Sequence, residues 1–501
     1  MKDWKRKYTS MMLLASMLIL CVSCGSDAGE PSGGETTAGD ETTTSEETTG
    51  RYDPGLPDAD FGGYEFTFAV RGEEGVQYHW NGTDIVADEQ NGDILNDAVY
   101  ERNNYLRDKY NVKIAAKFCG GTSTSTSGSE MSKVISSSIM SGDADFDAIL
   151  TSPYDSVGYV MNEYVTDLSK INNMDLTREW WDQNVTRDLS FGSKVYMASG
   201  DISYIDNKAT HVMVFDKQLV DEYDIDDPYE DVRSGKWTLD KFFANCDKVT
   251  ADLNGDNVYS KEDRFGYAYW QDAAFAFIYS TGNSFGEIKN GEPELTLYSE
   301  RMVDSWQKLI SFIKTDSAFS ILDNLKQFED NNADSALDYM LSGHHALYGF
   351  TTVSVVLQLR SSDADFGIIP HPKFDEAQKN YIVSPHSYGN TLLTVPVTTR
   401  DPDRTGFILE AFSAKSAEIV TPAFYDKTLI GKSTRDDESA EMLELIFSSK
   451  KYDIGNFFAW GDLTNKVMTA WNKKNENIAS VYQGAEAKAL ADIDKIKELF
   501  E

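Results

Sequence analysis

Five segments between residues 64 and 153 alternate between strand and helix patterns, and this order limits the fold more than any other feature. The strand patterns are YEFTFAV (64–70), NVKIAAKF (111–118) and FDAILTSP (146–153), and the helix patterns between them are DILNDAVYERNNYLRDKY (93–110) and SEMSKVISSSIMSG (129–142). Asp93 is expected to cap the first helix and Gly142 to end the second. Strands that alternate with helices predict a mostly parallel sheet with helices on both faces.

The carboxyl ends of these strands are the expected place for a ligand. In open α/β sheets, ligands bind beyond the carboxyl ends of the strands. The chain from Arg71 to Trp80 follows the first strand, and Pro153 to Asp155 follows the third. We therefore expect these two segments to line a binding site.

The N-terminal residues have the pattern of an export signal that ends in a lipid attachment site. A basic start, MKDWKRK, precedes a short apolar run that ends at Val22, as in a secretory signal peptide. The run is shorter than the roughly 20 apolar residues that cross a bilayer. VSCG (22–25) resembles a bacterial lipobox, although Cys21 stands where that pattern usually has Leu. We expect removal of residues 1–23 and acylation of Cys24, with a plain secreted protein as the alternative.

Residues 24–57 are expected to form a flexible, low-complexity linker. From Gly25 to Gly50 the chain is rich in Gly, Ser, Thr and Glu and has no aromatic residue, so it buries too little surface to fold. The whole chain has a formal net charge of -36, which disfavours nucleic acid as a partner. With an acylated Cys24, this linker predicts a folded body held by lipid on the extracellular face of the bacterial cell membrane.

From Asp147 onward, the order of segments resembles that of the family 1 extracellular solute-binding proteins, the receptor class of the maltose-binding protein. The segments are FDAILTSP, YVTDLSKI, SFGSKVYMASGDISY, ATHVMVFDKQLVDEYDIDDPYE, GKWTLDKFFANCDKV, SGHHALYGF, DADFGIIPHPKFDEAQKNYI and GNTLLTVPVTTRDPDRTGFILEAF. Each segment alone is a weak match, but with the lipidated start their succession covers nearly all of residues 64–501. The resemblance therefore carries expectations about both fold and function.

The resemblance implies an α/β fold of two lobes, of the class of type 2 periplasmic binding proteins, with the ligand cleft between the lobes. We expect residues 58–178 and 364–415 in one lobe, and residues 179–363 and 416–501 in the other. The resemblance also implies closure of the lobes around a solute and docking on the transmembrane subunits of an ABC-type permease. The expected function is capture of an extracellular sugar or oligosaccharide without covalent change.

Aromatic residues that follow predicted strands are candidate platforms for a carbohydrate. Sugars stack their CH-rich faces on rings and need acceptors for their hydroxyl groups. The candidate ligand-binding residues are the rings Trp80, Tyr204, Trp270 and Phe350 and the polar residues Asp155, Asp201 and Gln271. Each ring has core packing as its alternative role. Trp180 and Trp181 are adjacent, so one is free to face the cleft while the other packs.

The segment TADLNGDNVYSKEDRFG (250–266) has the spacing of a calcium-binding loop. Asp252, Asn254, Asp256, Val258, Ser260 and Asp263 occupy positions one, three, five, seven, nine and twelve, with Val258 providing its carbonyl oxygen. Asn257 replaces the usual Gly at position six, and Asp263 replaces the bidentate Glu, which lowers the expected affinity. We expect a structural Ca²⁺, and an Asx-rich surface turn without an ion is the alternative.

Two further patterns are poor evidence for an enzyme. GNSFG (282–286) satisfies GxSxG, but a nucleophile elbow needs a helix directly after it, and EIKNGEPEL predicts a hairpin or loop. The six histidines form no HExxH motif, so a zinc site is not expected. We therefore expect a protein that is not an enzyme. The alternatives are an exported polysaccharide-degrading lipoprotein, a glycoside hydrolase with paired carboxylates, and a surface adhesin without lobe closure.

Overall fold

The computed structural model of the protein describes residues 51–74, 76, 79–122, 128–359, 361–362, 364–429 and 437–500. The predicted signal peptide, the acylation site Cys24 and the predicted linker as far as Gly50 lie outside these residues. Their assignment stays a prediction from the sequence.

The three strand patterns form strands of the predicted sheet, the two helix patterns form helices between them, and a later strand completes the sheet. Its strands are β1 (Tyr64–Val70), β2 (Val112–Phe118), β3 (Ala148–Thr151) and β11 (Leu392–Thr394), in the order β11-β3-β1-β2. β1 is parallel to both β2 and β3, whereas β11 is antiparallel to β3. Asp93 caps α2 (Ile94–Tyr110), and Gly142 ends α3 (Glu130–Ser141) in the left-handed conformation. The predicted order and both predicted helix ends are confirmed.

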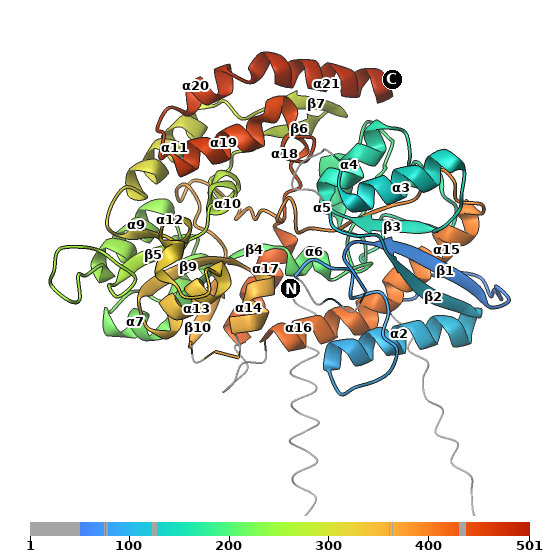
Figure 1. Ribbon diagram of the computed structural model, residues 1–501, viewed down its shortest axis with the longest axis horizontal. Coiled ribbons are helices and arrows are strands. Elements are labelled where there is room, and N and C mark those ends of the chain that lie inside the picture. Colours follow the sequence, from blue (N-terminus) through green and yellow to red (C-terminus); the bar gives the residue numbers. More distant parts are fainter. Residues whose placement is uncertain are drawn as a thin grey trace, which may run out of the picture. The chain divides into compact units, whose positions relative to one another are not determined.

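Later parts of the chain build a second, five-stranded sheet. Its strands are β10 (Phe366–Ile369), β4 (His211–Asp216), β9 (Ala346–Thr352), β5 (Phe265–Tyr269) and β8 (Ala318–Ser320), in that order. β4 is antiparallel to both β9 and β10, and β5 is parallel to both β8 and β9. We call the first sheet with its helices lobe 1 and the second sheet with its helices lobe 2 (Figure 1).

Helices cover both sheets. Lobe 1 has α2, α3, α4 (Pro153–Met161), η1 (Leu168–Lys170), α5 (Gln183–Leu189), α15 (Pro402–Lys415) and the π-helical turn η3 (Ser416–Val420). Lobe 2 has α7 (Lys217–Glu222), α8 (Pro228–Arg233), α9 (Leu239–Val249), α10 (Ala273–Ser280), α11 (Glu300–Phe312), α12 (Ile321–Asn324), η2 (Leu325–Gln327), α13 (Ala333–Ser342), α14 (Val353–Leu359) and α17 (Asp437–Ser448). Every residue of α10 is buried, as expected of the almost wholly apolar sequence AAFAFIYS.

A hairpin and the C-terminal helices extend lobe 2. β6 (Gly286–Lys289) and β7 (Glu292–Leu295) pair with each other, and α18 (Ile454–Phe457), η4 (Trp460–Asp462), α19 (Leu463–Asn472), α20 (Ile478–Gln483) and α21 (Glu486–Phe500) follow at the end of the chain. α18 packs on β6, and α21 packs on β7. Figure 1 shows these helices above the second sheet. The C-terminal part of the chain is therefore mostly a helical layer on lobe 2.

Two segments that connect the sheets lie side by side. Residues 209–211 lead into β4, and residues 383–386 belong to the chain that returns toward β11. The N–H of His211 donates to the carbonyl of Ser384 at 3.2 Å, and the N–H of His386 donates to the carbonyl of Ala209 at 2.8 Å. The short helix α6 (Ile205–Lys208) precedes the first segment, and α16 (Thr421–Leu429) contacts both α2 and α14. The connections between the lobes are thus hydrogen-bonded to each other.

The predicted lobe boundaries stay predictions, and the observed lobes depart from them at several places, including η3 (Ser416–Val420), which packs with lobe 1 although residues 416–501 are predicted for the second lobe. Residues 364–415 are predicted for the first lobe, yet β10 pairs with β4 in lobe 2. Residue 179 is predicted to open the second lobe, yet Trp180 and Trp181 pack in the core around the first sheet. The departures occur near connecting segments because strand pairing between distant segments leaves no local pattern in the sequence.

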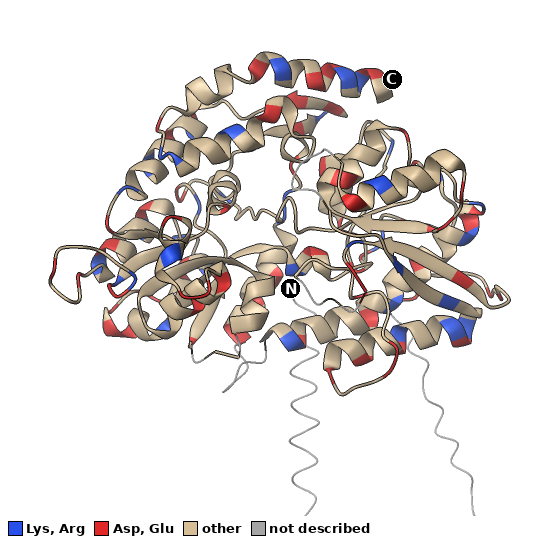
Figure 2. Ribbon diagram, in the orientation of Figure 1, with Lys and Arg blue, Asp and Glu red and all other residues tan. Residues whose placement is uncertain are grey.

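Acidic residues belong to both lobes. Figure 2 shows Asp and Glu on helices and loops of each lobe, in keeping with the net charge of -36. Within the described ranges, no helix combines the length and the apolar character that a membrane span requires. The charge therefore does not single out one lobe as the place for a charged partner.

Candidate functional site

Five side-chain rings form a continuous row between the two sheets, which we call the ring row. Its members, in order, are Trp80, His386, His211, Phe350 and His371. The centroids of successive rings lie 5.4, 5.2, 5.1 and 5.7 Å apart. Trp80 follows β1 of lobe 1, Phe350 lies in β9 of lobe 2, and His386 lies in a connecting segment. The row therefore runs from the carboxyl end of β1 to the sheet of lobe 2.

Strand register brings three of these rings to one end of the lobe 2 sheet. In the β4–β9 pair, Met213 lies opposite Phe350, and in the β10–β4 pair the same Met213 lies opposite Ile369. His371 lies two residues beyond Ile369, past the end of β10, and segment 384–386 pairs with residues 209–211 along this part of β4. Since side chains two residues apart share a face of a strand, the rings of His211, Phe350 and His371 gather on one face.

The three histidines of the ring row are neutral at physiological pH because they are buried. Burial lowers the pKa of His371 to about 3 and the pKa of His211 well below its usual value, and it lowers the pKa of His386 as well. Nδ1 of His386 accepts hydrogen bonds from the backbone N–H groups of Tyr388 and Gly389, which leaves the proton on Nε2. His386 therefore presents an N–H donor from Nε2.

Several buried polar atoms in or next to the ring row have no hydrogen-bond partner within the described part of the chain. They include Nε2 of His211, Nε2 of His371 and Nδ2 of Asn390. His211 uses its other ring nitrogen for a hydrogen bond with Ser384 Oγ at 2.8 Å. Buried polar atoms without partners destabilise a fold by about 1–3 kcal/mol each. A polar ligand that reached these atoms would remove that cost.

Asp272 adds an acidic acceptor beside the ring row. It precedes α10 but makes no side-chain hydrogen bond to the helix, and its carboxylate has no hydrogen-bond partner among the other described residues. Burial raises the pKa of Asp272, and attraction to His386 opposes this shift. The charge of Asp272 also acts on Tyr154 at the start of α4, across from lobe 2. A half-buried carboxylate without a partner is a strong acceptor for ligand hydroxyl groups.

The chain beneath Trp80 fixes the position of its indole. A Cβ atom on Gly389 would come within 3.0 Å of the Trp80 ring, so only glycine fits there without a shift. Arg71, at the end of β1, donates hydrogen bonds to the carbonyl oxygens of Tyr388 and Gly389. It also donates to Thr391 Oγ1 at 2.9 Å. The strand end that sequence analysis selected is thus tied to the connecting segment that carries His386.

The structure brings two of the predicted ligand residues, Trp80 and Phe350, into the ring row. Two others, Trp270 and Gln271, directly precede Asp272 at the end of β5. Trp270 is half-buried, whereas Gln271 accepts a hydrogen bond from Asn472 of α19 at 2.9 Å. The side chain of Trp270 takes no part in that hydrogen bond.

The remaining predicted ligand residues have partners elsewhere. Asp155 accepts a hydrogen bond from Ser129 Oγ at 2.7 Å, Asp201 accepts one from Thr421 Oγ1 at 2.6 Å, and Tyr204 stacks on Phe424 with centroids 5.3 Å apart. Burial raises the pKa of Asp201 to about 7. These contacts belong to the N-terminal cap of α3 and to the packing of α16.

Trp180 and Trp181 both pack in lobe 1, so neither faces a cleft. Both indoles are almost fully buried. The two indole N–H groups donate to Glu410 at 3.2 and 2.9 Å, and the backbone N–H of Asp175 donates to the same carboxylate. Burial raises the pKa of Glu410 to about 7. One buried acid therefore satisfies both tryptophans without a counter-cation.

The predicted calcium loop is a turn held by its own side chains. Asp252, Asn254 and Asp256 accept hydrogen bonds from backbone N–H groups of the loop. Asn257 has the left-handed φ of 62° expected at position six. Asp263 is buried, and both of its oxygens accept backbone N–H groups. In the described ranges no group of three or more His, Cys, Asp or Glu side chains is arranged to hold a metal.

The GxSxG segment is not a nucleophile elbow. β6 begins at Gly286, directly after the serine and phenylalanine, and pairs with β7 as the predicted hairpin. Ser284 Oγ lies 2.9 Å from Glu287 Oε1 and 3.0 Å from Thr296 Oγ1, and these contacts involve no histidine. The segment is therefore a turn into a hairpin.

Sequence analysis missed Asp272 and the three histidines of the ring row. The histidines were compared only with zinc motifs, which they do not match. Their common feature is topological, because His211 opens β4 and His371 follows β10. This becomes visible only when the antiparallel register of those strands is known.

No protein-family model matches the sequence, and no curated protein matches it either. Solved structures do match. An ABC substrate-binding protein from Listeria monocytogenes in complex with cycloalternan is 13% identical, with 87% of this chain and 99% of that chain covered and a TM-score of 0.53. A cyclo/maltodextrin-binding protein complexed with maltotetraose is 11% identical, with 88% and 97% covered and a TM-score of 0.54.

UgpB from Mycobacterium tuberculosis in complex with glycerophosphocholine is 13% identical, with 80% of this chain and 95% of that chain covered and a TM-score of 0.53. At identities this low, the likeness concerns the fold. The chain has the two-lobed α/β fold of these maltose-binding-like proteins, as the resemblance implied.

Proposed function

We propose that the protein is a family 1 extracellular solute-binding receptor of an ABC-type importer that captures a sugar or oligosaccharide without changing it. The two-lobed fold supports this proposal, since the solved structures with that fold include sugar-bound ABC receptors. A fold alone does not fix a function. The ring row and Asp272 supply the evidence that is specific to this chain.

The observation that carries the proposal is a row of aromatic and imidazole rings flanked by polar atoms without partners, placed between two lobes. Rings suit the CH-rich faces of a sugar, and an unpaired carboxylate suits its hydroxyl groups. Asp272 is such a carboxylate, and His211 and His371 each keep a free ring nitrogen. A purely apolar ligand would leave these polar atoms without hydrogen bonds, and burying them would then destabilise the complex.

A thermal-shift screen of the purified protein tests the proposal. The panel contains cycloalternan, maltotetraose, glycerophosphocholine and common mono- and disaccharides. At least one saccharide is expected to raise the melting temperature, and Asp272→Asn is expected to weaken its binding at least tenfold, because hydrogen bonds to charged groups contribute about 1.5–3 kcal/mol. Asp240→Asn, at an exposed carboxylate, is the matched control and should bind as the wild type does.

Incubation with the same glycans separates the receptor from the glycoside hydrolase alternative. The receptor leaves every glycan intact, so chromatography before and after incubation should give the same peaks. Released products, or the absence of any saccharide-induced shift, would overturn the proposal. An adhesin would bind on a broad face, and its scattering profile would not change with ligand.

The proposed attachment is a lipid on Cys24, followed by the linker up to residue 57. The lipobox-like sequence supports it, and confinement near the membrane would raise the local concentration of loaded receptor at a permease. In cells grown with a labelled fatty acid, the wild type should carry label and partition into detergent. Cys24→Ser should carry no label, and a labelled Cys24→Ser protein would contradict the attachment site.

We further propose a structural Ca²⁺ in the loop of residues 252–263. The loop offers carboxylate, amide, hydroxyl and carbonyl oxygens, and each oxygen that accepts an N–H group keeps a second lone pair. A chelator is expected to lower the melting temperature of the wild type more than that of Asp256→Ala. Equal shifts of the melting temperature in the two proteins would contradict the proposed Ca²⁺ site.

A further inference from the structure

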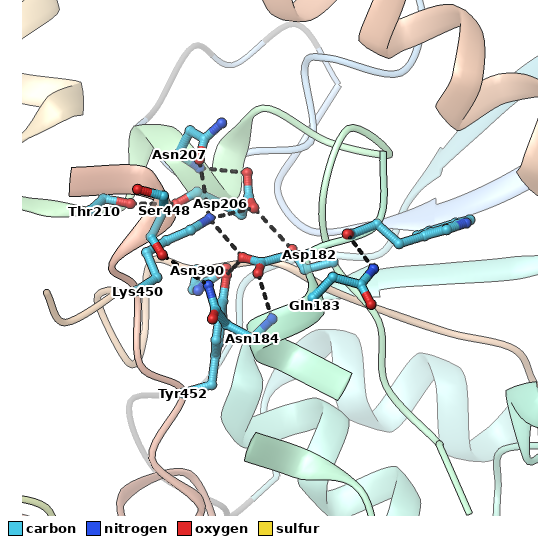
Figure 3. Close-up of polar contacts among 12 residues, drawn as sticks. Asp182, Gln183, Asn184, Asp206, Asn207, Thr210, Asn390, Ser448, Lys450 and Tyr452 are labelled. Carbon is cyan, nitrogen blue, oxygen red and sulfur yellow. Dashed lines mark hydrogen bonds and ion pairs between the residues drawn. The ribbon is translucent and has the colours of Figure 1, made fainter. Parts of the chain in front are cut away.

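A buried lysine from the C-terminal part of the chain lies where the connecting segments meet. Lys450 Nζ is 2.9 Å from Asp206 Oδ2 and 3.2 Å from Asp182 Oδ2, and it donates to Asn207 Oδ1 at 3.1 Å. Tyr452 donates its hydroxyl to Asp182 at 2.9 Å. Figure 3 shows these five side chains pointing toward one another, and we call them the Lys450 cluster.

The polar groups of the Lys450 cluster are buried and paired with one another. The side chains of Lys450 and Asp206 are 3% and 1% exposed. Burial opposes the charge of Lys450, but the attraction of Asp206 and Asp182 keeps the pKa of the lysine well above its usual value. Ser199 Oγ donates to Asp206, and the backbone N–H of Asn184 donates to Asp182 at the start of α5. Every member is therefore held by at least one specific polar contact.

The backbone of Lys450 continues this connection into the ring row. The N–H of Val383 donates to the carbonyl of Ser449 at 3.0 Å, and the N–H of Lys451 donates to the carbonyl of Val383 at 2.9 Å. Val383 is followed by Ser384, which hydrogen-bonds His211, and soon after by His386. Lys450 thus joins lobe 1 and the entry to β4 through its side chain. As the bridge partner of Val383, it also joins the segment that carries His386 and hydrogen-bonds His211.

We infer that Lys450 is a positioning residue for solute capture, which fixes the connecting segments 209–211 and 383–386 relative to each other and so sets the placement of His211 and His386. Lys450 does not touch the solute. The inference rests on the proposed function for its link to binding, while the positioning itself is a property of the unliganded protein. It predicts local loosening of the connecting segments when the cluster loses its charges.

The test uses the full-length double variant Lys450→Met/Asp206→Asn, which removes one cation and one anion together and leaves Asp182 with Tyr452. The matched control is Lys308→Met/Asp240→Asn, which removes an exposed ion pair of 2.7 Å in the same way. The single variant Lys450→Arg, in which Asp206 is unchanged, is the conservative variant because it keeps the positive charge. Hydrogen exchange is measured on all four proteins without ligand, and affinity is measured for the saccharide of the panel that shifts the wild type most.

The expected result is at least tenfold faster exchange at the amides of His211, His386 and Lys451, with unchanged exchange in β1–β3 and β5. Affinity for the saccharide is expected to fall at least fivefold in the double variant, to stay unchanged in the surface control, and to be partly restored by arginine. Unchanged exchange at the three amides would overturn the inference. Faster exchange throughout both sheets would also overturn it, because the cluster would then be a general contribution to stability.

The two proposals fail separately in this experiment. If no panel compound binds the wild type, the proposed function fails, while the exchange data still decide whether Lys450 positions the connecting segments. If the double variant exchanges faster at those amides but binds the saccharide as the wild type does, the function stands and the role of Lys450 in capture is wrong. A double variant that does not fold is replaced by Tyr452→Phe, which removes only the hydroxyl that orients Asp182.

Discussion

The ring row and the Lys450 cluster are both buried between the lobes, yet they treat their polar atoms in opposite ways. In the Lys450 cluster each charge has a partner of opposite sign or a hydroxyl donor. In and beside the ring row, Nε2 of His211, Nε2 of His371 and Nδ2 of Asn390 have no partner among the described residues. The difference separates a place that is complete without a ligand from one that a polar ligand would complete.

The largest expected effect breaks the completed cluster. Lys450→Met alone leaves Asp182 and Asp206 buried beside each other without a cation, which should lower the free energy of unfolding by about 3–5 kcal/mol. Denaturant titration measures this loss. The charge-balanced variant Lys450→Met/Asp206→Asn should lose clearly less, and an equal loss in both variants would show that packing, rather than charge, holds the cluster.

The second prediction concerns a buried carboxylate that lacks a cation. Glu410 in the folded protein has a pKa of about 7, above its usual value of 4.5. The folded state therefore holds the proton more tightly, so the contribution of Glu410 to stability falls as pH rises from about 4.5 to about 7. The change is on the order of 3 kcal/mol, since one pKa unit equals about 1.36 kcal/mol.

Glu410→Gln isolates this dependence. Other acids with a raised pKa, such as Asp201 and Asp453, remain in the variant, so the difference between wild type and variant reports Glu410. The wild type should lose stability relative to Glu410→Gln as pH rises through this window. A difference that stays constant between pH 4.5 and 7 would show that the indole N–H groups keep the carboxylate ionised in both states.

The third prediction concerns the fit beneath Trp80. Gly389→Ala places a methyl group within 3.0 Å of the indole, so the ring or the connecting segment must move. The expected loss of stability is about 1–3 kcal/mol, as for other overpacked cores. Saccharide affinity should also fall because the platform moves. Gly121→Ala, where a Cβ has no neighbour within 4 Å, is the matched control and should change neither quantity.

The smallest expected effect on stability is at an unpaired polar atom of the ring row. His371→Phe removes a nitrogen without a partner and keeps a ring between Phe350 and Phe277. Its free energy of unfolding should rise by up to about 1 kcal/mol or stay unchanged, because an unsatisfied buried group is removed. Saccharide affinity should fall. A variant that is less stable and binds normally would show that His371 serves the core instead of a ligand.

The sequence predicted lobe 1 well because its signals are local. Alternating patterns, the cap at Asp93 and Gly142 at a helix end each depend on neighbouring residues, and all are found in the structure. The selection of Trp80 and Phe350 as ligand platforms stays a prediction, and in the structure Phe350 lies within β9 rather than after it. Gly291 and Pro293 predict a hairpin or loop after the GxSxG segment, and β6 and β7 confirm the hairpin.

The parts that sequence analysis missed depend on pairing between distant segments. His211 and His371 both contact Phe350 only because strands that are distant in the sequence pair with each other, and Glu410 accepts hydrogen bonds from both tryptophans from more than 200 positions away. Asp155, Asp201 and Tyr204 follow strands as a binding residue would, but they are used by a helix cap and by α16. Their residue types suit both roles, and only their neighbours decide between them.

The lysine at the meeting point of the connecting segments has a consequence for the order in which the chain matures. Lys450 is 244 positions away from Asp206 along the sequence, and a chain is synthesised from its N-terminus. Both lobes can therefore begin to fold before Lys450 is available to pair with Asp182 and Asp206. A chain that ended before residue 450 would have two largely folded lobes, with Asp182 and Asp206 left without their cation. Such a chain would be a target for quality control by proteases.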